Sequence, residues 1–244
     1  MASHKDFGDL KAIFLNCSIK VDKTGSHTQR LMNRVAGVMR DEGVNVEQVY
    51  MLDHKIAFGM VKDGKDTGQE DDWPAIHKKV MDADILVIGS PIWLGAKSSV
   101  ATLAIERLYA YSGDRNDKGQ WTYYGKTGGC IITGNEDGIK HCAMDLLYAL
   151  QHIGYTIPPQ ADCGWIGEAG PGPSYGDTEW EGEKFAVPKG YDNEFTNRNA
   201  TYMAWNLMHM ARMLKDNGGY PPVGNTTEGW EHVTNAKREN PEYR

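Results

Sequence analysis

The segment from Ser18 to Gln29 has the residue types of a phosphate-binding loop. Its hydroxyl side chains and glycine precede apolar residues at helical spacing, so the segment leads into the start of a helix. A helix amino terminus presents unpaired amides and the positive end of its dipole, and it binds phosphate without arginine. We take Ser18, Ser26, His27 and Thr28 as candidate binding residues. Ser26 and Gln29 also have the spacing of a capping box, so a helix start without a ligand explains the same residues.

A second segment, residues 85–95 (ILVIGSPIWLG), has the residue types of a site for a planar aromatic ligand. Its first half is too apolar to face water, which is typical of a buried parallel strand, and its second half forms the loop that follows. Pro91 stiffens that loop, Gly95 allows close approach of the backbone, and Trp93 offers a wide apolar face. Trp93 as a core or interface residue is the alternative. The candidate binding residues are Pro91, Ile92, Trp93, Leu94 and Gly95.

A third segment, TGNEDG at residues 133–138, follows another apolar strand pattern and again opens a helix. Its backbone amides and the Asn135 side chain are suited to the polar edge of a flat heterocycle. A helix start capped by Asn or Asp is the alternative. The candidate binding residues are Thr133, Gly134, Asn135, Glu136, Asp137 and Gly138. Together the three segments describe a site for a mononucleotide with a large ring.

These segments need a scaffold that places them at one edge, and the apolar pattern predicts it. Strands alternate with amphipathic helices, which indicates an α/β protein with a parallel sheet covered by helices on both faces. Because ligand segments follow the first and third strands, we expect the flavodoxin-like doubly wound order 2-1-3-4-5, whose switch point lies between those strands. The predicted strands cover residues 12–18, 44–50, 85–90, 127–133 and, at the edge, 155–158; the last helix covers about 194–215.

The chain has 244 residues, enough for one large core with appended segments. We predict a polar amino-terminal extension at 1–10, one domain over 11–217 and a polar tail at 218–244. The loop predicted at 164–193 is too long for a simple connector, so we expect it to border the ligand pocket or to pack on a neighbouring subunit. A second irregular segment, 53–72, is an insertion without an assigned role.

Composition narrows the possible functions. The net charge of -7 and the absence of a long basic cluster disfavour nucleic-acid binding. No run of about 20 apolar residues could span a bilayer, and the first residues lack the apolar core of a signal peptide, so we expect a cytoplasmic protein. The four cysteines are far apart and form no metal-ligand pattern, so no metal is expected and most cysteines should be small core residues.

The sequence resembles the flavodoxin-like NAD(P)H-dependent FMN reductases, which include related quinone reductases. The resemblance covers about residues 11–215 and rests on NCS followed by GSHTQRL, on GSPIWLG, on TGNEDG and on GWIGEAGPGPSY. It implies that Ser18, Ser26 and Thr28 hold the FMN phosphate. It also implies that residues 91–95 carry the ribityl chain and one side of the isoalloxazine, and that 133–138 meet its pyrimidine edge. The phosphate loop departs from the family pattern in its greater length and in His27.

The resemblance implies an FMN-dependent NAD(P)H oxidoreductase that passes hydride from a nicotinamide to FMN and then reduces a small acceptor such as a flavin or quinone. Because the cofactor performs the chemistry, we nominate no catalytic side chain. A flavodoxin-type electron-transfer protein that binds FMN without nicotinamide turnover is the alternative. A flavin-free signalling module is disfavoured, because Ser90 stands where such a module needs an acidic residue. Exposed aromatic residues and the insertions favour a homodimer or homotetramer.

Overall fold

The central parallel sheet has the strand order that the sequence predicts. The computed structural model describes residues 6–170 and 172–230. Five strands follow the order β2-β1-β3-β5-β6 and every neighbouring pair is parallel, which corresponds to 2-1-3-4-5 for the five main strands. A sixth, two-residue strand, β4, pairs antiparallel with the end of β3. The strands are β1 (Lys11–Asn16), β2 (Asn45–Tyr50), β3 (Ile85–Trp93), β4 (Ala96–Lys97), β5 (Thr127–Asn135) and β6 (Asp162–Gly167).

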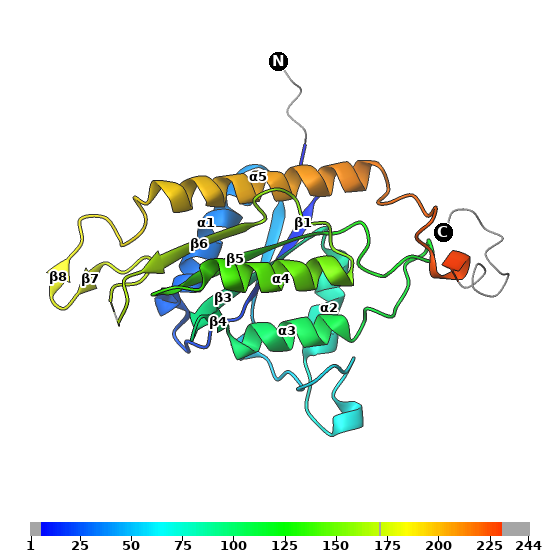
Figure 1. The fold of residues 1–244 in the computed structure, drawn as a ribbon, viewed down its shortest axis with the longest axis horizontal. Coiled ribbons are helices and arrows are strands. Elements are labelled where there is room, and N and C mark those ends of the chain that lie inside the picture. Colours follow the sequence, from blue (N-terminus) through cyan, green and yellow to red (C-terminus); the bar gives the residue numbers. More distant parts are fainter. Residues whose placement is uncertain (1–5, 171, 231–244) are drawn as a thin grey trace, which may run out of the picture.

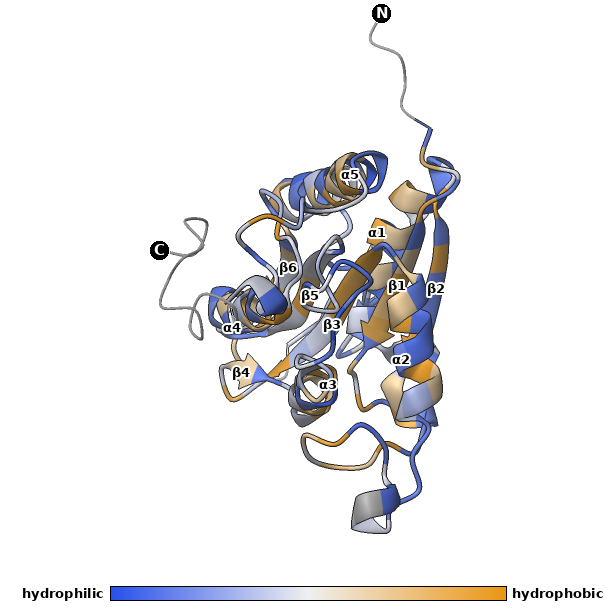
Figure 2. Cartoon of the chain, turned by 90° about the vertical axis from the view of Figure 1, so that its right-hand side faces the viewer, coloured by the Kyte–Doolittle hydropathy of each residue, from blue (hydrophilic) through white to orange (hydrophobic). Residues whose placement is uncertain are grey.

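Helices cover both faces of the sheet (Figures 1 and 2). One core lies between the sheet and α1 and α5, and a second lies between the sheet and the other three helices. Side chains alternate along β1, so Phe14 belongs to the first core and Leu15 to the second, as burial on both faces requires. All four cysteines are buried and free, as expected for small core residues. The helices are α1 (His27–Asp41), α2 (Trp73–Asp82), α3 (Ser99–Tyr109), α4 (Ile139–Ile153) and α5 (Glu194–Asp216).

The position predicted for the fifth strand was wrong. Residues 155–158 contribute only an isolated bridge between Thr156 and Thr127, and the edge strand is β6, whose residues 164–167 fall within the predicted loop. The prolines that close 155–158 prevent that segment from pairing further. In β6, Cys163 and Trp165 are buried while the glycines between and after them weaken the apolar pattern.

The predicted end of the third strand was also too early. β3 continues through Pro91 to Trp93, and a turn at Leu94 and Gly95 returns the chain along β4. Both turn residues have positive φ, +50° and +73°. α3 therefore begins only at Ser99, after β4. The loop after the strand is therefore a hydrogen-bonded turn with a fixed shape.

Described residues of both predicted terminal segments, 1–10 and 218–244, pack on the main body. Phe7 and Leu10, within the predicted extension 1–10, are buried in the core beside α1 and α5. Residues 1–5 and 231–244 lie outside the described residues. At the other end, the buried side chain of Gln120 donates to Asn225 Oδ1 at 2.9 Å, and the Thr227 amide donates to the carbonyl of Gly119 at 3.2 Å. Within the described ranges, no helix is both long enough and apolar enough to cross a membrane.

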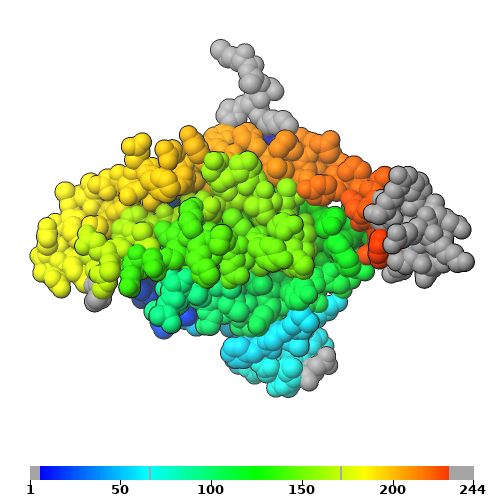
Figure 3. Space-filling model, viewed as in Figure 1, coloured from blue at the N-terminus to red at the C-terminus, as the bar shows by residue number. Residues whose placement is uncertain are grey.

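Two segments extend from the main body. The 53–72 insertion forms a lobe that projects at the bottom of the molecule, drawn in cyan (Figure 3). The segment 168–193 carries a small hairpin, β7 (Glu179–Trp180) with β8 (Glu183–Lys184), and lies beyond the carboxyl end of β6 (Figure 1). Open α/β sheets bind ligands at this edge, so 168–193 lies where the site is expected.

Candidate functional site

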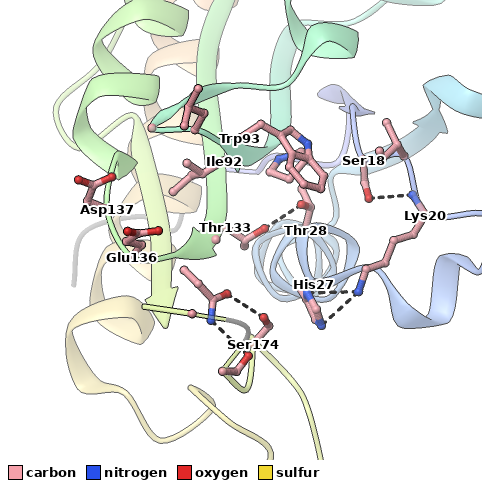
Figure 4. A pocket seen from close by; sticks show the side chains of 18 of the residues that line it. Ser18, Lys20, His27, Thr28, Ile92, Trp93, Thr133, Glu136, Asp137 and Ser174 are labelled. Carbon is pink, nitrogen blue, oxygen red and sulfur yellow. Dashed lines mark hydrogen bonds between the residues drawn. The ribbon is translucent and has the colours of Figure 1, made fainter. Parts of the chain in front are cut away.

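A cleft of about 830 Å³ opens at the carboxyl edge of the sheet (Figure 4). Residues of all three predicted segments line it, together with residues from the segment 168–193. The volume lies within the range of about 300–1,000 Å³ that is typical of small-molecule sites. The fold therefore assembles into one cavity three segments that are far apart in the sequence.

Thirteen of the fifteen predicted residues line this cleft. The two exceptions have structural roles. Ser26 is fully buried, and its Oγ accepts a hydrogen bond from the Gln29 amide at 3.2 Å, so it is the amino-terminal cap of α1. Gly138 has φ of +100°, and a Cβ there would lie 2.8 Å from the Gly95 carbonyl oxygen, so it permits close packing of two turns. The thirteen are Ser18, His27, Thr28, Pro91, Ile92, Trp93, Leu94, Gly95, Thr133, Gly134, Asn135, Glu136 and Asp137.

One end of the cleft is rich in hydroxyl and cationic groups. Ser18 and Lys20 follow β1, while His27 and Thr28 begin α1, so the amino terminus of that helix faces the cleft (Figure 4). The hydroxyls of Thr28 and Thr133 lie 2.8 Å apart and join α1 to β5. This end has the donors and the helix dipole that suit an anionic group.

A carboxylate from the late segment fixes this cationic end. Asp177 Oδ1 accepts hydrogen bonds from His27 Nε2 at 3.0 Å and from Arg30 at 3.1 Å, and Oδ2 accepts from the Ser174 amide at 2.8 Å. Burial alone would raise the pKa of Asp177, but the Ser174 amide and the neighbouring His27 and Arg30 lower it overall. The ionised form is therefore favoured. This carboxylate holds the late segment against α1.

The other part of the cleft is apolar on one side and acidic on the other. The Trp93 side chain, at the end of β3, is 53% exposed, so it is not a core residue. Its apolar ring is open to a ligand or a partner protein. Ile92 packs against β5, where a Cβ on Gly134 would lie 2.8 Å from the Ile92 Cβ. Glu136 and Asp137 lie on the side of the cleft away from Ser18 and Lys20 (Figure 4).

The Asn135 side chain lines the cleft and is also hydrogen-bonded to the late segment. Its Nδ2 donates to the carbonyl of Glu168 at 3.2 Å and lies 3.3 Å from that of Gly172, and its Oδ1 accepts from the Ser174 hydroxyl at 2.8 Å. These bonds use the amide to tie 168–174 to the end of β5.

Sequence reasoning missed the individual residues that the late segment contributes. Its length predicted a segment that borders the pocket or packs on a neighbouring subunit, and the structure places it at the cleft. Nothing in the pattern singled out Asp177 or Ser174. Polar contacts between residues that are 150 positions apart have no periodic signal in the sequence. The additional lining residues are Ile19, Lys20, Gly170, Gly172, Ser174, Asp177 and Trp180.

A sheet of this order with its cleft at the carboxyl edge defines a flavodoxin-like protein. The chain belongs to the NADPH-dependent FMN reductase family, whose model matches residues 10–165. The family expectation from the sequence is thereby confirmed.

Two relatives match most of the chain. The 8-demethyl-8-aminoriboflavin-5'-phosphate synthase of Streptomyces davaonensis is 35% identical over 213 residues, which cover 85% of this chain and 79% of that protein. A Mycobacterium bovis protein named a divalent metal cation transporter is 54% identical over 210 residues, which cover 86% of this chain. The chain spans only 30% of that second protein, so the transporter name describes a much longer molecule.

Solved structures agree with this assignment. The crystal structure of RosB with a bound 8-demethyl-8-formylriboflavin-5'-phosphate intermediate superimposes with a TM-score of 0.80 at 32% identity, covering 95% of this chain and 88% of RosB. A short-chain flavodoxin aligns with a TM-score of 0.50 at 15% identity, over 83% of this chain and 99% of its own, and shows the shared fold alone.

Proposed function

We propose that the protein is an FMN-dependent oxidoreductase that takes hydride from NAD(P)H and reduces a small acceptor such as a flavin or a quinone. The observation that carries the proposal is the cleft, in which a hydroxyl- and cation-lined end adjoins an exposed tryptophan at the switch point of the sheet. Membership of the FMN reductase family supports the same reading.

The residues present fit a flavin mononucleotide. Ser18, Lys20, His27 and Thr28 with the amides of α1 would hold the phosphate, because their donors converge on one end of the cleft. The turn at 91–95 would lie along the ring, and the backbone at 133–137 would meet its polar edge. Bound FMN would supply the redox chemistry, accepting hydride from a nicotinamide and passing electrons to the acceptor. The chain itself would bind, orient and shield the ring, and no side chain is required to move a proton.

A second candidate is a flavin-modifying enzyme for which FMN is the substrate. The RosB structure favours it, since that protein aligns over most of this chain and holds a flavin altered at position 8. A flavodoxin-type electron carrier is a third possibility, and it predicts FMN binding without a reaction with nicotinamides. We also propose a cytoplasmic location and a homodimer or homotetramer.

The test begins with the visible spectrum of the purified protein, in which bands near about 370 and 450 nm indicate bound flavin. Anaerobic NADPH or NADH should then bleach the 450 nm band within seconds, whereas an electron carrier would keep its colour. Protein incubated with FMN, air and a primary-amine donor is analysed by mass spectrometry. Recovery of unchanged FMN supports the reductase function. Detection of an 8-amino flavin would instead support the flavin-modifying function. A protein that remains colourless after excess FMN has been added and the unbound flavin removed would refute all three candidate functions.

A further inference from the structure

His27 lies at the cationic end of the cleft, where a hydrogen bond to Asp177 determines which ring nitrogen carries the proton. Its Nε2 donates to Asp177 Oδ1 at 3.0 Å, because a carboxylate can only accept. In the neutral ring the proton is therefore on Nε2, and Nδ1 carries a lone pair. The side chain is 23% exposed and lines the cleft beside Ser18 and Thr28. A ligand at this end meets a ring that can accept one more proton.

The charged groups around His27 come from three segments. Lys20 Nζ, after β1, lies 3.4 Å from both ring nitrogens and also donates to the Gly25 carbonyl at 2.8 Å. Arg30, one turn along α1, shares the same Asp177 oxygen at 3.1 Å. Asp22 adds a more distant negative charge that acts on Lys20. With His27 neutral, the two cations Lys20 and Arg30 are opposed by the carboxylate of Asp177 and, at greater distance, by that of Asp22.

This arrangement disfavours the charged ring while the cleft holds no anion. Burial lowers the pKa of His27 below its usual value, and the nearby Lys20 lowers it further, while Asp177 opposes the shift. Burial also lowers the pKa of Lys20, and Arg30 adds to that shift while Asp177 and Asp22 oppose it. A dianion placed here would reverse the balance, because it would attract a second proton onto the ring.

We propose that His27 is a proton-linked specificity residue, which takes up a proton on Nδ1 from solvent when a phosphate monoester dianion binds beside Lys20. The preference of the cleft for the phosphorylated flavin over riboflavin would then increase as the pH falls from about 8 to about 6.5. This inference rests on the proposed binding of FMN. It goes beyond that function because it assigns to one side chain both the recognition of the phosphate and the pH dependence of affinity.

The inference is tested by measuring flavin affinity without turnover. The flavin-free protein is titrated with FMN and with riboflavin by fluorescence quenching at several pH values, and by calorimetry at pH 7 in two buffers of different ionisation enthalpy. For the wild type, the Kd for FMN should fall about three- to tenfold between about pH 8 and pH 6.5, and the calorimetry should report proton uptake. The Kd for riboflavin should stay constant.

Two variants isolate the side chain. His27→Gln keeps a polar group of similar reach, so its Kd for FMN should be weaker and lose the pH dependence above the second phosphate pKa of about 6. His152→Gln is the matched control, because His152 lies at the carboxyl end of α4, at the opposite edge of the sheet. The His152→Gln variant should bind FMN with the same Kd and the same pH dependence as the wild type.

The outcomes separate the inference from the proposed function. FMN binding with the same pH dependence in wild type and His27→Gln, or without proton uptake by the wild type, would overturn the role of His27 and leave the flavoprotein intact. Failure of the wild type to bind FMN at any pH would instead refute the proposed function, and the inference with it. Absence of proton uptake by the wild type would overturn the inference whether or not His27→Gln folds.

Discussion

Arg107 and Asp71 form a buried ion pair between α3 and the end of the 53–72 insertion. Their side chains are 0% and 4% exposed, and Arg107 Nη2 lies 2.6 Å from Asp71 Oδ2. The same guanidinium donates to the carbonyls of Ala57 at 2.7 Å and Lys62 at 3.1 Å. One side chain of the main body therefore satisfies three acceptors of the insertion, which gives a polar segment a fixed attachment.

Replacing Arg107 with methionine should destabilise the protein by about 3–5 kcal/mol, because Asp71 would remain buried without its partner. Urea unfolding of the variant measures the loss. The exposed pair of Lys55 and Glu70 in the same insertion provides the control, and Glu70→Gln should cost at most about 1 kcal/mol. Equal effects of the two substitutions would contradict the role assigned to burial.

The fold was predictable where the sequence is continuously apolar and the ends of elements are marked. β1, β3 and β5 are buried on both faces, so their apolar runs identify them, and Ser26 marks the start of α1 as its cap. β6 was not predictable because close packing requires glycine at positions where an apolar side chain would mark a strand. A Cβ on Gly164 would lie 2.7 Å from the Ile132 carbonyl oxygen, so the position that should complete the pattern cannot carry a side chain.

The candidate site divides in the same way. The segments after β1, β3 and β5 were predictable because the carboxyl ends of parallel strands meet at one edge. The contribution of Asp177 was not, because it depends on a fold-back of 168–193 that polar hydrogen bonds determine. Asn135 was identified as a site residue, but its side chain ties down that same segment.

His77 should make the protein less stable in acid. It is stacked on Tyr111 with ring centroids 3.5 Å apart, and its Nε2 lies 2.9 Å from the hydroxyl of Tyr123, which itself donates to the Leu108 carbonyl. Burial, aided by Lys126 and other nearby cations, lowers its pKa to about 4. The unfolded chain, with a pKa near 6.5, then binds the proton more readily, so stability falls as the pH drops from about 6.5 to about 4.

Urea midpoints of the wild type and of His77→Phe measure this contribution between about pH 7 and pH 4.5. Phenylalanine keeps the stacking but cannot bind a proton, so its stability should depend less on pH, by on the order of 2 kcal/mol over that range. The carboxylates contribute equally to the pH dependence of stability in both proteins, so their contribution cancels when the two curves are subtracted. Parallel curves for the two proteins would show that His77 is not the titrating group.

Two glycine-to-alanine substitutions should have opposite effects. At Gly138, φ is +100° and an alanine Cβ would meet the backbone of Gly95 at 2.8 Å, so Gly138→Ala should cost more than about 1 kcal/mol and displace the β3–β4 turn. Gly37 lies inside α1, where a Cβ meets nothing within 4 Å. Gly37→Ala should stabilise the helix by about 0.5–1 kcal/mol. Thermal unfolding and flavin titration of both variants check this, and weakened flavin binding is expected only for Gly138→Ala.

The hydrogen bonds of Asn135 should determine how firmly 168–174 closes the cleft. Asn135→Ala removes the donor to the Glu168 carbonyl and the acceptor for the Ser174 hydroxyl. Each lost bond is worth about 0.5–1.5 kcal/mol, so the segment should open more often while the core stays intact. Limited proteolysis should then cut 168–177 several times faster, with little change in the urea midpoint. Ser174→Ala, which removes only one of these bonds, should lie between wild type and Asn135→Ala. Protection of both variants by added flavin would show that the same segment closes over the ligand, and unchanged cleavage in Asn135→Ala would mean that Asp177 alone holds it.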